Sequence, residues 1–252
     1  DVDPDLAALY QPMLARETNR NLGKPLAIAV DTIERLHATA EREGARLHLL
    51  TERDDLVGAA AILAAADRIR YLTPRLHAEM VSELRWPGEG NPDTGIDVRS
   101  LELEPDDLAM VGILRRPDVM AQLARWNVGS VLGEDTGRRI AASSALAVIS
   151  VAGGSLADYA RGGSAVEAVW IIAQQHGLAI QPISPVFLYA RDAEDLAELS
   201  TAFADDLGEL EQKFRELVRI PASASPALML RVAVAAPASV RSRRTIERVR
   251  LL

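Results

Sequence analysis

The chain of 252 residues contains no cysteine, only 4% aromatic residues and few lysines. The absence of cysteine excludes disulfides, thiolate nucleophiles and cysteine metal sites. It also suits a reducing compartment, so we expect a cytoplasmic protein. The four histidines are scattered and never stand at the spacing of a metal motif, so no metal is predicted.

Long apolar runs are missing as well. No stretch reaches the roughly 20 apolar residues of a membrane-spanning helix, so we expect no membrane partner. The formal net charge of −8 argues against a nucleic-acid partner. The first residues are acidic, unlike a signal peptide, and the chain does not begin with methionine, so we expect a domain of a longer protein.

A strand–helix–strand unit stands at the centre of what is present. Residues 144–151 are a short apolar, β-branched run that predicts a strand, and residues 178–183 predict a second one. Between them, residues 156–176 carry apolar side chains at helical spacing, and the second half is apolar nearly all round. Gly177 is either an ordinary end of this helix or a point where backbone approaches a flat ligand.

Helical and strand patterns mix without strict alternation around this unit, which predicts an α+β fold with a small mixed sheet enclosed by helices. Helices are predicted over residues 5–15, 31–43, 54–70, 74–86, 117–126 and 192–218, with Gly208 as the point where the last could divide. Strands are predicted over residues 46–51 and 227–236, and residues 97–104 are expected to be extended. We expect one single domain, 1–252, in which residues 93–137 are an insertion or lid with too few large apolar residues for a core of their own.

Arginines cluster near both ends of the chain. Arg16 and Arg20 flank Thr18, and the last residues contain Arg241, Arg243 and Arg244. Guanidinium groups bind phosphate through bidentate, charge-assisted hydrogen bonds, so the clusters could hold an anion. The alternative is that they pair with acidic side chains on the surface.

The ordered set of these features resembles the flavin-dependent nitroreductase family. The Arg-x-Thr-x-Arg at 16–20 is similar to the family's Arg-x-Ser-x-Arg/Lys entry motif, and the helix ending in Gly177-Leu178 is similar to its core helix. The strand 227–236 with the Arg-Ser-Arg-Arg after it is similar to the family's terminal strand and basic phosphate-binding signature. Residues 161–167 and 177–184 look closest to the actinobacterial Acg-like branch, and closer still to the C-terminal nitroreductase-like portion fused to a ThiF/E1-type adenylyltransferase domain, a molybdopterin-biosynthesis-like protein.

The resemblance implies a nitroreductase-like α+β fold and a homodimer, with one face of the helix 156–176 on the sheet and another on the dimer partner. It implies FMN at the dimer interface, NAD(P)H as the reductant, and a nitro compound or quinone as the electron acceptor. The flavin-binding residues that it implies are Arg16, Thr18 and Arg20 at the ribityl, phosphate and pyrimidine edge, the backbone of Pro182, Ile183 and Ser184 near the reactive N5 edge, and Arg241 and Arg243 on the phosphate.

Two other functions stay open on the same residues. One is a flavin-binding or flavin-sequestering module without catalysis. The other is a dimerisation module that serves an N-terminal adenylyltransferase domain of the longer chain.

Overall fold

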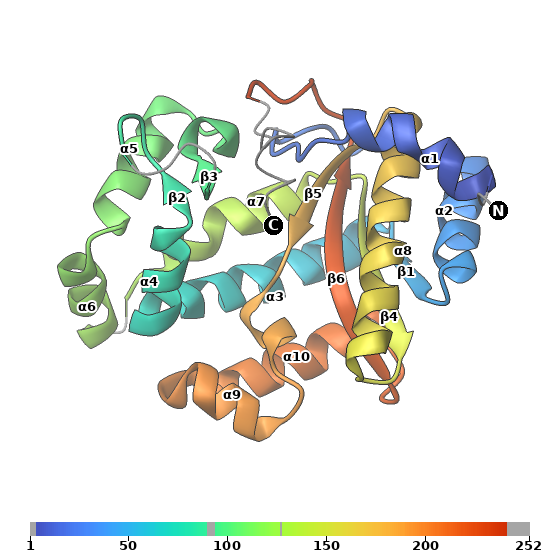
Figure 1. Cartoon of the computed structure of the whole chain (residues 1–252). Helices are drawn as coiled ribbons and strands as arrows, with labels where there is room; N and C mark the ends of the chain where they lie inside the picture. Colours follow the sequence, from blue (N-terminus) through green and yellow to red (C-terminus); the bar gives the residue numbers. More distant parts are fainter. Residues whose placement is uncertain (1–3, 90–93, 127, 241–252) are drawn as a thin grey trace.

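The computed structural model describes residues 4–89, 94–126 and 128–240. A four-stranded antiparallel sheet with the strand order β1-β4-β6-β5 runs through the molecule (Figure 1). Its strands are β1 (Arg46–Leu50), β4 (Ala145–Ala152), β5 (Ala179–Ile183) and β6 (Ala224–Ala233). A separate, two-stranded parallel sheet pairs β2 (Leu84–Arg85) with β3 (Ile96–Asp97). The prediction of an α+β fold with a small, mainly antiparallel sheet enclosed by helices is confirmed.

Helices cover both faces of the large sheet and extend from it to one side (Figure 1). The α-helices are α1 (Pro4–Ala15), α2 (Val30–Arg42), α3 (Arg53–Leu72), α4 (Pro74–Ser82), α5 (Pro105–Leu114), α6 (Pro117–Arg125), α7 (Glu134–Ala141), α8 (Leu156–Gln175), α9 (Ala193–Leu199) and α10 (Ala204–Val218). Short 3-10 helices are η1 (Val98–Leu101), η2 (Ser130–Gly133), η3 (Val186–Tyr189) and η4 (Thr201–Phe203). Within the described ranges, no helix combines the length and apolar character that crossing a bilayer requires.

The sheet separates the two larger of the three clusters of buried side chains in the described core. Leu146 and Val148 of β4 join the cluster that contains side chains of α3 and α10, whereas Ala147 and Ile149 join the cluster of α2 and α8. Successive side chains of a strand point to opposite faces, so both faces of β4 are buried. This is why residues 144–151 show a continuous apolar run in place of an alternating pattern.

The start and the end of helix α8 are both set by capping residues. Ser155 and Asp158 form a reciprocal capping box at its start, and Gly177 follows its end with a φ of +75°. The sheet covers one face, and α1 and α2 of the same chain contact others. Its apolar surface is therefore covered in large part within the chain.

Several predicted boundaries are wrong for identifiable reasons. Of the run 97–104 that was expected to be extended, only Asp97 pairs in a sheet, because its side chain accepts a hydrogen bond from Arg99 N and starts η1. Helix α4 ends at Ser82, before Trp86, because β2 pairs with β3. The helix expected over 192–218 divides at residues 200–203 and not at Gly208, which lies inside α10.

Strand β6 begins at Ala224, three residues earlier than predicted, and ends at Ala233. Pro226 is accommodated because the pairing of β4 with β6 shifts register between Ile149 and Ser150. Helix α7, which was not predicted, begins with the polar run Glu-Asp-Thr-Gly-Arg-Arg and buries only Arg139 and Ile140. Such a helix has too little apolar periodicity to be read from sequence.

Candidate functional site

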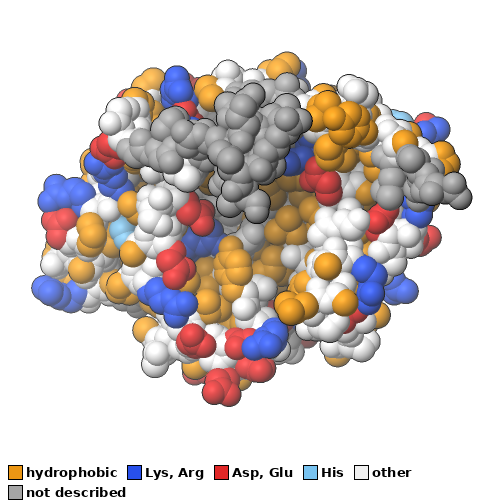
Figure 2. All heavy atoms as spheres, in the orientation of Figure 1, with side chains coloured by type: hydrophobic (Ala, Val, Ile, Leu, Met, Phe, Trp, Pro, Cys, Tyr) orange, Lys and Arg blue, Asp and Glu red, His pale blue; other side chains and the backbone are white. Residues whose placement is uncertain are grey.

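A cavity of about 700 Å³ opens beside the outer strand β5. One wall comes from β5, α3 and α7, and the other from α4, the small sheet and α5. Figure 2 shows apolar side chains gathered in the hollow of this face, flanked by acidic and basic side chains. Apolar residues of both walls, including Leu84, Leu101, Met110 and Ile183, line the cavity.

Segment 93–137 supplies much of the outer wall. Leu101, Leu103, Met110 and Val111 all line the cavity from this segment. Helix α5 has no buried residue at all, and Met120 is the buried residue of α6. The segment thus contributes a few side chains to the core and several to the cavity.

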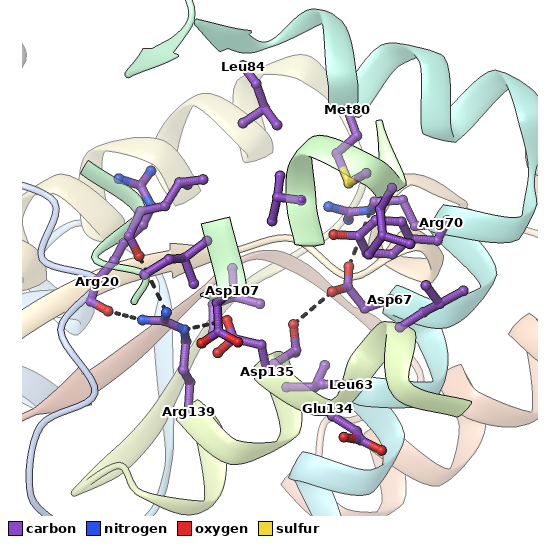
Figure 3. Close-up of a pocket in the computed structure, with 18 of the residues that line it drawn as sticks. Arg20, Leu63, Asp67, Arg70, Met80, Leu84, Asp107, Glu134, Asp135 and Arg139 are labelled. Carbon is purple, nitrogen blue, oxygen red and sulfur yellow. Dashed lines mark hydrogen bonds and ion pairs between the residues drawn. The ribbon is translucent and has the colours of Figure 1, made fainter. Parts of the chain in front are cut away.

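Arg20 lies at one end of the cavity, next to Arg139 (Figure 3). Its segment is held to the edge of the sheet, since Asn19 N donates to Ile180 O at 2.8 Å and Arg139 Nη1 donates to Arg20 O. Arg20 Nη1 makes two long contacts to Ser100, 3.3 Å to the carbonyl oxygen and 3.4 Å to Oγ. Burial, and then the charge of Arg139, lowers the pKa of Arg20.

The charge of Arg139 is balanced from within α7. Arg139 Nε lies 2.6 Å from Asp135 Oδ2, and Arg138 Nη2 lies 2.6 Å from Asp135 Oδ1. Burial opposes ionisation of Asp135, but the two arginine hydrogen bonds outweigh it, so the pKa of Asp135 is lowered. Asp135 is therefore a carboxylate that anchors the basic end of the cavity.

Arg231 of the sheet forms hydrogen bonds with the residues around this basic end of the cavity. It is only 1% exposed, in the interior strand β6. It donates to Gln181 Oε1 at 3.1 Å and to Asn21 O at 2.6 Å, and also to Leu22 O. Burial, and then Arg139, lowers the pKa of Arg231 to about 10. The side-chain oxygen Oε1 of Gln181 accepts this hydrogen bond from Arg231, so its amide nitrogen remains as the donor of that side chain. Gln181 also lines the cavity.

The opposite end of the cavity contains Asp67, Arg70 and Tyr71 of α3 (Figure 3 labels the first two). Thr136 Oγ1 donates to Asp67 Oδ2 at 2.8 Å, and Arg70 Nη2 donates to Ser184 O. The sequence analysis missed this group. Its one local signal is the spacing of the three polar residues along one side of an alanine-rich helix, since Thr136 lies 69 residues away.

The structure separates the predicted flavin-binding residues into three groups. Arg20, Pro182, Ile183 and Ser184 line the cavity together. Arg16 and Thr18 are half-buried, and neither is among the residues that line it. The predicted residues Arg241 and Arg243 lie outside the described residues.

Arg16 faces helix α8. Its Nε lies 2.7 Å from Glu167 Oε1, and its guanidinium carbon lies 4.2 Å from the centre of the Trp170 ring. The alternative prediction of pairing with an acidic side chain thus describes Arg16 as it stands. Gly177 ends α8 as an ordinary cap, and the cavity-lining part of β5 begins four residues later, at Gln181.

Comparison with known proteins identifies the fold. No protein-family model matches the chain. The structure of an oxidized iodotyrosine deiodinase bound to FMN and 3-iodo-L-tyrosine aligns with a TM-score of 0.52 and 12% identity, over 94% of this chain and 95% of that one. A variant of the FMN- and NADPH-dependent nitroreductase NfnB from Sphigopyxis sp. strain HMH aligns with a TM-score of 0.50 and 12% identity, over 96% of each chain. The chain therefore has the nitroreductase-like fold.

One curated relative is much more similar in sequence. The uncharacterized protein MT1398 of Mycobacterium tuberculosis (strain CDC 1551 / Oshkosh) is 57% identical over 244 residues, which is 97% of this chain. The match covers 34% of that protein, so the chain spans about a third of the length of this relative.

Proposed function

We propose that the chain is an FMN-binding, NAD(P)H-dependent oxidoreductase of the nitroreductase type, which reduces a nitro compound or a quinone. The observation that carries the proposal is the cavity, in which Arg20 and residues 182–184 of β5 face one space. The fold adds support, because the structure of the iodotyrosine deiodinase is FMN-bound and the NfnB nitroreductase is FMN-dependent.

The cavity fits the flat ring of FMN. A volume of about 700 Å³ lies within the range of cofactor sites, and apolar side chains form the facing walls. Among the described residues, the hydrogen bonds of the Arg20 side chain come from Nη1 alone, so Nε and Nη2 can serve a ligand. Arg20 and the amide of Gln181 suit the carbonyl-bearing pyrimidine edge of the ring, which accepts hydrogen bonds.

FMN, when bound, would supply the two-electron hydride chemistry, and the protein would supply position, charge and a shielded space. Arg20 would stabilise negative charge at the pyrimidine edge, because a cation is favourable beside a charge that develops in an apolar site. The backbone of residues 182–184 would lie along the reactive edge. Arg16, with Thr18, Arg241 and Arg243, remains the predicted phosphate contact, and in that role Arg16 would exchange Glu167 for the phosphate.

The absorption spectrum of the purified protein and a titration with FMN test the proposal. Arg20→Ala should weaken FMN binding, because it removes a charge-assisted hydrogen bond worth about 1.5–3 kcal/mol, or roughly 10- to 150-fold in Kd. Arg125→Ala, an exposed residue at the end of α6, is the matched control and should bind FMN normally. A protein that stays colourless after incubation with FMN rules out the proposed cofactor.

A flavin-binding module without turnover is the second candidate. It is favoured by the outer wall, because side chains of segment 93–137 line the cavity and would restrict the room for a bulky acceptor. Steady-state oxidation of NADPH in the presence of a quinone separates the two candidates. Flavin binding without NADPH oxidation would favour the second.

The proposal includes two partners. One is a second copy of the chain, since apolar side chains such as Tyr10 (56% exposed) and Val30 (71% exposed) remain open to solvent. The other is an N-terminal adenylyltransferase domain, for which the unmatched two-thirds of the mycobacterial relative leaves room. The third function kept open by the sequence, a dimerisation module for that domain, is tested by the same FMN titration.

A further inference from the structure

The end of the cavity opposite Arg20 holds two groups that can donate a proton. Asp67 and Tyr71 are one turn apart on α3, so they lie on the same side of this helix. Both line the cavity. The hydroxyl group of Tyr71 makes no hydrogen bond to the described part of the chain. It is therefore a donor available to a bound molecule.

One oxygen of Asp67 is in a hydrogen bond, and the other forms a long ion pair with Arg70. Its Oδ2 accepts the 2.8 Å hydrogen bond from Thr136 Oγ1. Its Oδ1 lies 3.9 Å from Arg70 Nε, which is beyond hydrogen-bond distance. The side chain is 24% exposed, and the cavity is the space that it lines. A proton on Oδ1 would thus be presented to the cavity.

The surroundings of Asp67 favour its protonated form. Burial raises the pKa of Asp67, and the charge of Asp135 raises it further. Arg70 and the hydroxyl of Thr136 oppose this shift without cancelling it. Tyr71 completes the set, and burial together with the charge of Asp67 and Asp135 raises its pKa to about 12. Tyr71 therefore stays protonated at neutral pH.

Arg70 links this group to the strand that the flavin ring would face. Its guanidinium donates to Ser184 O, at the end of β5, while its Nε points toward Asp67. The proton donors are thereby tied to the residues 182–184 that would lie along the reactive edge. An acceptor placed over that edge would have the Asp67–Tyr71 wall beside it.

We propose that Asp67 and Tyr71 bind the oxygen of the electron acceptor, and that Asp67 delivers the proton which that oxygen requires on reduction. This rests on the proposed function. It selects acceptors whose oxygen becomes basic when electrons arrive, with quinones as the best-matched class. Tyr71 donates a hydrogen bond to the same oxygen and holds it in place.

The step balances for a quinone. Conversion to a hydroquinone takes two electrons and two protons, and a hydride from the NAD(P)H reductant brings both electrons and one proton. The second proton passes from Asp67 Oδ1 to the quinone oxygen, so one O–H bond breaks as another forms. The carboxylate then recovers a proton from water.

The acceptor-dependence of the rate tests this assignment in the FMN-loaded protein. A quinone needs the proton, whereas ferricyanide takes single electrons and needs none. Asp67→Asn should lower the ratio of the quinone rate to the ferricyanide rate by roughly 100-fold, the scale of general-acid catalysis. Asp118→Asn, an exposed residue of α6, is the control and should leave that ratio unchanged.

The pH dependence of the quinone rate is a second measurement, and a purely structural role of Asp67 would not change it. The quinone rate of the wild type should fall as pH rises through the pKa of Asp67, because only the protonated form donates. The profile of Asp67→Asn should lack that step. Equal losses with both acceptors, or an unchanged ratio, would overturn the proposal.

Binding of 4-nitrophenolate to the flavin-free protein gives a test without turnover. The affinity of the wild type should weaken as Asp67 ionises, and Asp67→Asn and Tyr71→Phe should each weaken binding at the lower pH. If Asp67→Asn does not fold, the effect of Tyr71→Phe decides, and unchanged binding by that variant overturns the assignment. Failure to bind FMN would refute the proposed function alone, since this measurement needs no flavin.

Discussion

Arg231 places a positive charge in an interior strand, and its described hydrogen-bond partners are all neutral. Besides the carbonyl groups of Asn21 and Leu22 and the side chain of Gln181, Nε reaches Arg139 O at 3.2 Å and Ser143 Oγ at 3.1 Å. Burying a charge is unfavourable unless such partners replace water. Arg231 therefore ties the segment of Arg20, helix α7 and strand β5 to one point.

Replacing Arg231 by Met should strongly destabilise the protein. The change leaves several buried carbonyl groups without donors, and each costs about 1–3 kcal/mol, so we expect a loss of at least ~3 kcal/mol in the free energy of unfolding. Urea unfolding measures this loss. Arg191→Met is the matched control, because Arg191 is an exposed partner of Asp195, and it should leave the free energy of unfolding almost unchanged. A variant as stable as the wild type would contradict the role given to Arg231.

The sequence indicated Arg20 and residues 182–184 but could not indicate Asp67 or Arg231. Arg20 and residues 182–184 could be indicated because the motif and the strand follow one another in a recognisable order, and the structure places them around one cavity. Asp67 stands in an alanine-rich helix, and its partner Thr136 comes from a helix without an apolar pattern. The role of Arg231 depends on acceptors about 210 residues away, which no local pattern records.

At the scale of elements, the strand–helix–strand unit was predictable because local and tertiary signals agree there. The capping box fixes the start of α8, Gly177 fixes its end, and the buried faces match the apolar pattern. The boundaries of the elements within residues 93–137 could not be predicted from the sequence. Here β3 and η1 depend on one side-chain hydrogen bond of Asp97 and on pairing across a loop. The secondary-structure propensities of the residues reveal neither the hydrogen bond nor the pairing.

Two neighbouring glycines of α8 provide a test of its packing. A methyl group at Gly162 would meet Ala227 Cβ at 2.6 Å and Val151 Cγ1 at 3.3 Å, whereas one at Gly163 would meet nothing within 4 Å. Gly162→Ala should therefore destabilise the protein by about 1–3 kcal/mol through overpacking against the sheet. Gly163→Ala should stabilise it by roughly 0.5–1 kcal/mol, because alanine favours the helix.

Thermal and urea unfolding of both glycine variants measure the difference. The two substitutions add the same atom to adjacent positions of one helix, so intrinsic helix propensity cancels between them. Equal effects of both variants would mean that α8 does not approach β4 and β6 as closely as described.

At the scale of the whole molecule, the open apolar surface predicts self-association. Helix α5 has no buried residue within one chain, and apolar side chains of the N-terminal region are open as well. We expect sedimentation equilibrium to give twice the chain mass of 27.2 kDa. A single-chain mass at micromolar concentration, both with and without FMN, would contradict the proposed homodimer.

Strand β6 comes last in sequence among the described strands, yet it lies between β4 and β5. Until it is synthesised, β5 has no neighbour in the sheet, and the segment of Arg20 lacks the carbonyl and side-chain partners at residues 231–236. The basic end of the cavity is thus assembled only after residues 224–236 have been synthesised. A nascent chain that still lacks β6 exposes the unpaired edge of β4, which is a site for aggregation.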